Sequence, residues 1–133
     1  MILPTIHFPG NCNEAIAFYE KAFIVTEKQV SLYRDAPPNS GMAITEDMLD
    51  LVMHANITIC GTKFNCSDTQ KEIIPGNMIL FNVFIETENE VRNAFENLKV
   101  GGTVLINLGP QFFSKMYGSI VDKFGIQWQL ILK

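Results

Sequence analysis

The chain has 133 residues, a formal net charge of −4 and a pI of about 5.1, which fits one acidic globular domain. No apolar run approaches the ~20 residues that span a bilayer, and the scattered lysines and arginines do not form the basic surface of a nucleic-acid-binding protein. The N-terminus has no basic stretch and no cleavage signal for secretion. We therefore expect a cytoplasmic protein with neither membrane nor nucleic acid as a partner.

The first half of the chain predicts the order strand, helix, strand, strand, strand. The expected strands cover about 2–8, 24–33, 51–60 and 62–66, and the helix covers about 12–22, where apolar residues recur at the spacing of one buried face. A long loop at 34–50 contains Pro37, Pro38 and Gly41, and long loops are often lids or binding edges. Residues 68–77 carry charge, a Pro and a Gly and form the expected linker.

The second half repeats this order. Strands are expected at about 78–86, 103–108, 116–122 and 126–132, and a helix at 88–100 that ends at Gly101-Gly102. Gly109-Pro110 is expected to end the strand at 103–108, and residues 111–115 are expected to be irregular. Both helices begin with a predicted capping box, at 11–14 and 87–90, and these starts are 76 residues apart (87 − 11).

The repeat predicts one α+β domain, 1–133, made of two βαβββ modules at about 1–67 and 78–133. The helices would cover one sheet face, and the other face would form a cup that a ligand, the other module or a second chain must cover.

Three cysteines, with no C-x-x-C pair, favour reduced thiols packed as small apolar side chains. The alternative is a nucleophilic Cys12 whose pKa is lowered by the start of a helix.

Four segments in this order resemble the PhnB-like branch of the vicinal oxygen chelate superfamily, which includes glyoxalase I, extradiol dioxygenases and bleomycin-resistance proteins. They are Gly10 to Tyr19, Met53-His54-Ala55, Gly101 to Val104, and Val121 to Trp128. The resemblance implies paired βαβββ modules, a cupped mixed sheet and a homodimer. In catalytic members, His and Glu from the first and last strand of each module hold a divalent metal, as suits imidazole and carboxylate ligands.

Carried over to this chain, the four metal-ligand positions fall on Pro4, Asn65, Leu80 and Gln129. None has an imidazole or a carboxylate, so the resemblance implies that the usual metal site is absent. We predict no cofactor, and a divalent metal remains the disfavoured alternative.

The predicted substrate-binding residues are His54, Asn65, Gln129 and Phe113, in a mostly apolar pocket; no catalytic residue is assigned. His54 shares a strand face with Asn56 and Thr58, although a lone strand His is often only hydrogen-bonded structure. Phe113 occupies a position where the branch commonly has Trp.

Two further aromatic or imidazole side chains are expected to have structural roles. His7 is expected on the helix-covered face or partly exposed, and Trp128, together with Leu130, is expected to pack beneath the helices.

Three functions remain open. The leading hypothesis is a PhnB-like small-molecule-binding protein without the usual metal. The alternatives are a metal-dependent lyase, isomerase or dioxygenase built around His54, and a structural homodimer whose cup is filled. A methyltransferase is disfavoured because no glycine-rich nucleotide loop follows a strand.

Overall fold

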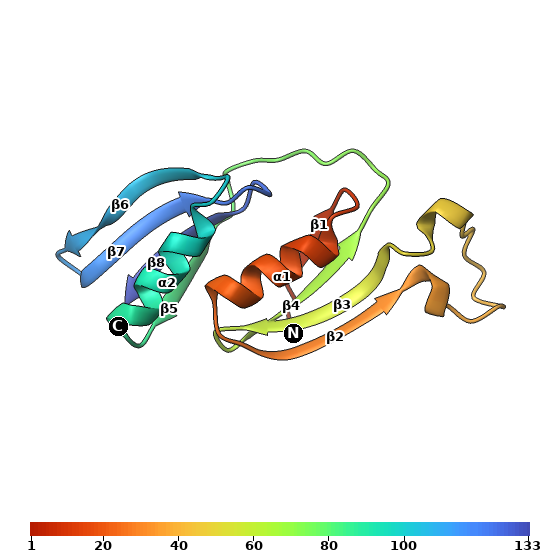
Figure 1. Cartoon of the computed structure of the whole chain (residues 1–133), viewed down its shortest axis with the longest axis horizontal. Coiled ribbons are helices and arrows are strands. Elements are labelled where there is room, and N and C mark those ends of the chain that lie inside the picture. The colour runs from red at the N-terminus through yellow and green to blue at the C-terminus, as the bar shows by residue number, and fades with distance from the viewer. The chain divides into compact units, whose positions relative to one another are not determined.

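The computed structural model describes all 133 residues and divides into two compact units (Figure 1). The first unit comprises 1–16 and 25–73, and the second comprises 17–24 and 74–133. The βαβββ order is confirmed in both halves, with these bounds: β1 Thr5–Phe8, α1 Cys12–Ala22, β2 Val25–Leu32, β3 Val52–Ile59, β4 Thr62–Asp68, β5 Phe81–Ile85, α2 Glu88–Leu98, β6 Thr103–Gln111, β7 Ser114–Val121 and β8 Gln127–Leu132.

The first unit contains a four-stranded sheet in the order β1-β4-β3-β2. β1 is parallel to β4, and the other neighbours are antiparallel. One face of this sheet is buried, and its main apolar residues are Phe8, Ala55, Ile57, Ile59, Phe64 and Cys66. Of the two alternatives for His7, the helix-covered face was wrong and an exposed side chain is confirmed: Phe8 lies on the buried face, so the strand alternation turns His7 to the opposite face.

Asp68, at the end of β4, holds the start of α1. Its buried carboxylate accepts hydrogen bonds from the N–H groups of Gly10 (3.1 Å), Cys12 (2.9 Å) and Val52 (2.8 Å). The predicted capping role of Asn11 was wrong, because its Oδ1 is buried and accepts no hydrogen bond. A carboxylate from a distant strand therefore satisfies the helix N-terminus.

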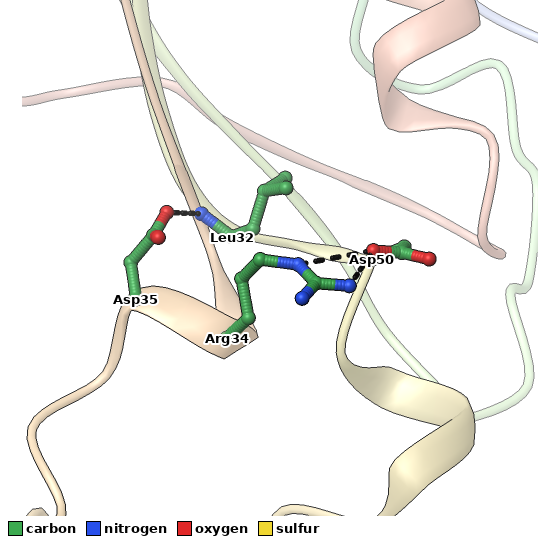
Figure 2. A network of polar contacts seen from close by, with 4 residues as sticks. All are labelled: Leu32, Arg34, Asp35 and Asp50. Atoms are coloured by element: carbon green, nitrogen blue, oxygen red, sulfur yellow. Dashed lines mark hydrogen bonds and ion pairs between the residues drawn. The ribbon is translucent and has the colours of Figure 1, made fainter.

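Hydrogen bonds hold together the two ends of the long loop between β2 and β3 (Figure 2). Arg34 donates to Asp50 through its guanidinium group, and the N–H of Leu32 donates to Asp35 at 2.9 Å. The N–H of Arg34 also binds the carbonyl of Leu49 at 3.1 Å. Hydrogen bonding to Asp50 raises the pKa of Arg34 above its usual value. Both ends of the predicted loop are thus joined, and short 3-10 helices occupy Tyr33–Asp35 and Glu46–Met48.

The second unit contains the sheet β5-β8-β7-β6, with β5 parallel to β8, and α2 packs against β5, β7 and β8 (Figure 1). The predicted cap of α2 is confirmed, because Thr87 Oγ1 accepts from the N–H of Glu90 at 3.2 Å. The predicted break at Gly109-Pro110 was wrong, since β6 continues to Gln111. β6 is an edge strand with three register shifts, and Pro is tolerated at such edges because no ladder donor is required there.

Asp122 is the buried polar centre of the second unit. Its Oδ1 accepts from the N–H groups of Phe124 (2.9 Å) and Ile126 (3.0 Å). Its Oδ2 accepts from Tyr19 Oη (2.7 Å) and Trp128 Nε1 (2.9 Å). Trp128 is fully buried, as predicted, with its ring 5.4 Å from that of Tyr19 between centroids. These contacts explain why the second half of α1 belongs to this unit.

Candidate functional site

The face of the first sheet that lies opposite its buried face, here called the first open face, is polar throughout. Strand register assigns to this face one residue of every two on each strand. It carries Thr5, His7, Glu27, Gln29, Ser31, His54, Asn56, Thr58, Lys63, Asn65 and Ser67. The predicted polar face of β3, with His54, Asn56 and Thr58, is thus present, but the lining in this unit is polar rather than mostly apolar.

His54 has a histidine neighbour that the sequence analysis missed. His7 pairs in register with Ser67 on β4, and His54 lies one residue beyond the pair Ala55–Cys66, which turns it toward the same face beside Ser67. Both imidazoles are exposed. Adjacent strands are about 4.8 Å apart, so the two backbones are about 10 Å apart with the Ser67 hydroxyl between them.

Asn65 lies in the next row of the same face. It pairs in register with Thr5 on β1 and with Asn56 on β3. Its Oδ1 is buried and has no hydrogen-bond partner. Buried acceptors without a protein partner are uncommon in folded proteins and are typically satisfied by a ligand or an ordered water. Asn65 and His54 therefore lie close together on one face, as the predicted site requires.

Gln129 and Phe113 both belong to the second unit. Gln129 pairs in register with Asn82 on β5 and with Ser119 on β7, opposite the face covered by α2. Phe113 lies at the turn between β6 and β7, is half exposed, and has its ring 5.1 Å from that of Tyr117 between centroids. The two residues therefore occupy different parts of the unit, Gln129 within a strand row and Phe113 at a hairpin turn.

The two halves carry equivalent polar pairs, Thr5 with Asn65 and Asn82 with Gln129. The helices are offset by 76 residues (88 − 12), but the buried strand residues Phe8 and Ile85 are offset by 77 (85 − 8), because the first strand-to-helix connection has one extra residue. With that offset Thr5 corresponds to Asn82 (82 − 5 = 77).

This register corrects the positions carried over for a metal. Pro4 and Leu80 lie outside β1 and β5, and the residues in register with Asn65 and Gln129 are Thr5 and Asn82. A hydroxyl and three amides do not match the His and Glu donors of the superfamily's metal. Nor does the structure contain a group of three or more His, Cys, Asp or Glu side chains that could hold an ion.

Cys12 and Cys66 are both fully buried in the first unit, where the Cys12 thiol donates to the Cys66 sulfur. That hydrogen bond and burial raise the pKa of Cys12, and acceptance of the bond lowers the pKa of Cys66. The alternative of a nucleophilic Cys12 with a lowered pKa was therefore wrong. The predicted packing as small apolar side chains is confirmed for Cys12 and Cys66, whereas Cys60 is only partly buried; none of the three forms a disulfide.

Residues 1–131 match the family described as 3-demethylubiquinone-9 3-methyltransferase. The chain belongs to this family. It is similar to Protein YjdN of Escherichia coli K12, with 26% identity over 141 residues that cover 96% of this chain and 91% of YjdN. It is also similar to the structure of the PhnB protein from Bacillus cereus, with 29% identity, coverage of 99% and 98%, and a TM-score of 0.78.

A more distant structure, the fosfomycin resistance protein FosX from Listeria monocytogenes, shares the fold at 14% identity, with coverage of 98% and 91% and a TM-score of 0.66. The family match and the PhnB structure confirm membership of the PhnB-like branch of the vicinal oxygen chelate superfamily, and the FosX structure shares the α+β fold. No helix of the structure has the length and apolar character needed to cross a membrane.

Proposed function

We propose that this chain binds a small polar molecule on its open sheet surface through neutral hydrogen-bonding groups, without the metal centre of the superfamily. The equivalent pairs Thr5–Asn65 and Asn82–Gln129 support the proposal. Each pair lies on the two parallel strands of its module, where the resemblance locates the metal ligands of catalytic members. Hydroxyl and amide groups at these positions can donate and accept hydrogen bonds but carry no charge for a cation.

The observation that carries the proposal is the buried, unpartnered Oδ1 of Asn65. Leaving such an acceptor unsatisfied costs about 1–3 kcal/mol, and a ligand N–H or O–H would recover this free energy. His54 and Asn56 extend the same face and can add further hydrogen bonds. The ligand is therefore expected to present at least one donor to Asn65.

The first experiment combines native mass spectrometry with elemental analysis of protein purified without chelator. We expect less than stoichiometric transition metal and a small-molecule adduct, or a thermal shift with donor-bearing polar compounds in a screen. Asn65→Leu keeps the approximate volume but removes the acceptor, so it should abolish the adduct or shift. Thr62→Val is the matched control and should retain it, because Thr62 is an exposed residue of β4 that pairs with Ile59 and does not belong to the first open face. Stoichiometric metal, or equal binding by Asn65→Leu and wild type, would contradict the proposal.

A second candidate is an enzyme with a non-standard metal site around His54, a lyase, isomerase or dioxygenase. The observation that favours it is His7 on the same face, with Ser67 between the two imidazoles. A panel of divalent metals tests it by thermal shift. A shift that disappears in both His7→Ala and His54→Ala would favour this candidate over metal-free binding.

The name of the matching family suggests methyl transfer, which we do not propose for this chain. The sequence has no glycine-rich loop between a strand and a helix, the element that cradles a nucleotide-like methyl donor in many methyltransferases. S-adenosylmethionine should therefore give no thermal shift. A saturable thermal shift with this compound would make methyl transfer a candidate function again.

We further propose that the chain acts as a cytoplasmic homodimer. Cysteines that form no disulfide suit a reducing compartment, and the dimer follows from the superfamily resemblance. A third candidate is a structural homodimer whose cup is filled by protein. Light scattering tests the dimer, and a dimer that binds nothing in the screen would favour this third candidate.

A further inference from the structure

The second unit contains a cavity that is separate from the two polar pairs. Its volume is about 590 Å³, within the range of small-molecule sites. Three segments form it: the connection from β5 to α2, the turn between β6 and β7, and the end of β8. Because all three segments belong to one unit, the site is complete within it.

Hydrogen bonds fix the base of this cavity. Ser114 Oγ donates to the carbonyl of Leu132 at 2.8 Å, which joins the β6–β7 turn to the end of β8. The N–H of Lys133 donates to the carbonyl of Ile85 at 2.9 Å, and its Nζ lies 2.7 Å from Glu86 Oε1. The base is therefore preformed, which reduces the entropic cost of binding a ligand.

Two charged side chains that line the cavity remain unpaired. Lys133 and Glu86 neutralise each other, whereas the Glu88 carboxylate and the Lys115 ammonium line the same cavity without an ion-pair partner. One unpaired group of each sign favours a ligand that also carries one charge of each sign. A simple anion or cation would meet a like charge as well as an opposite one.

The cavity also has an apolar wall. Phe112 is completely exposed and Phe113 is 51% exposed, with their rings 5.2 Å apart between centroids, and Pro110 lies beside them. Two adjacent exposed phenylalanines form an apolar patch of the kind that marks binding sites on soluble proteins. They can cover an apolar or aromatic ligand group.

We propose that this cavity binds a free α-amino acid with a large apolar side chain. Glu88 binds its ammonium group, Lys115 binds its carboxylate, and Phe112 and Phe113 contact its side chain. This site goes beyond the proposed function, since it shares no residue with the polar pairs of the open faces.

Titration calorimetry with three matched ligands tests the proposal: L-phenylalanine, phenethylamine, which lacks the carboxylate, and 3-phenylpropionate, which lacks the ammonium group. Wild type should bind phenylalanine about fivefold or more tightly than either analogue, as one extra charge pair implies. Glu88→Gln should lower the affinity for phenylalanine to that for phenylpropionate, and Lys115→Gln should lower it to that for phenethylamine. Phe113→Ala should weaken all three.

Two control variants make the result specific. Glu96→Gln removes another exposed carboxylate of α2 that does not line the cavity, and it should leave the affinities unchanged. Asn65→Leu, which tests the proposed function, should also leave phenylalanine binding intact. Equal affinity for the three ligands, no binding at millimolar concentration, or insensitivity to both Glu88→Gln and Lys115→Gln would overturn the proposal.

Discussion

Asp122→Asn should strongly destabilise the second unit, because the carboxylate accepts four hydrogen bonds that no neutral amide can accept together. Asn has only one acceptor oxygen. Whichever way the amide turns, either the two backbone N–H donors or the pair from Tyr19 and Trp128 loses its acceptor. Hydrogen bonds to a charged group are worth about 1.5–3 kcal/mol each, so the loss of two should cost about 3–6 kcal/mol. That is a large part of the 5–15 kcal/mol typical of a domain.

Urea unfolding followed by tryptophan fluorescence is the appropriate assay, since Trp128 is the only tryptophan and donates to this carboxylate. The urea concentration at the unfolding midpoint should fall, while the slope of the free energy of unfolding against urea concentration stays unchanged, as expected for a loss of stability alone. Glu72→Gln, at an exposed carboxylate outside the helices and strands, is the matched control and should change the free energy of unfolding by less than about 0.5 kcal/mol.

A double-mutant cycle with Tyr19→Phe tests the mechanism. In the wild-type background this change removes one donor and should cost about 1–2 kcal/mol. In the Asp122→Asn background it should cost much less if the amide has already lost that bond. The reasoning fails if Asp122→Asn costs less than about 1 kcal/mol. It also fails if Tyr19→Phe costs the same in both backgrounds while the N–H groups of Phe124 and Ile126 keep their acceptor.

Gly102→Ala should prevent folding or cost more than about 3 kcal/mol, because its Cβ would lie 2.3 Å from a backbone oxygen of β7. Gly109→Ala, with nothing within 4 Å, should change stability by less than about 0.5 kcal/mol, and equal effects in urea unfolding would contradict this contrast. Among the thiols, Cys60 should react readily with a disulfide reagent in the native protein, whereas Cys12 and Cys66 should react only in denaturant, since both are fully buried. Rapid labelling of all three thiols in the native protein would show that the buried pair opens easily.

The sequence predicted those features that depend on local patterns. The 3.6-residue apolar spacing and the two start signals located both helices, with α1 at its predicted bounds. Strand alternation gave the correct faces for His54 and Trp128, since each strand has clear apolar and polar sides. It was misapplied to His7: Thr5, Ile6, His7 and Phe8 alternate regularly, and the imidazole should have been assigned to the face opposite Ile6 and Phe8.

Features that depend on long-range contacts could not be predicted. Asp68 caps a helix that begins 56 residues earlier in the chain, and no local pattern links the two. The equivalence of Thr5 and Asn82 was hidden by the one-residue difference between strand and helix offsets. Pro4 lies one residue before Thr5, a shift that also changes the strand face. The helix offset of 76, used in place of 77, then placed its counterpart at Leu80, two residues before Asn82.

That extra residue also accounts for the different ways in which the two helices begin. In the second half, Thr87 follows Ile85 after one residue and caps its own helix, while Leu132 at the end of β8 is apolar. In the first half the connection is longer, and the residue of β4 that corresponds to Leu132 is Asp68, whose carboxylate binds the Cys12 N–H instead. The two halves therefore share one order of strands and helix but satisfy their helix N-termini with different side chains, Asp68 in the first and Thr87 in the second.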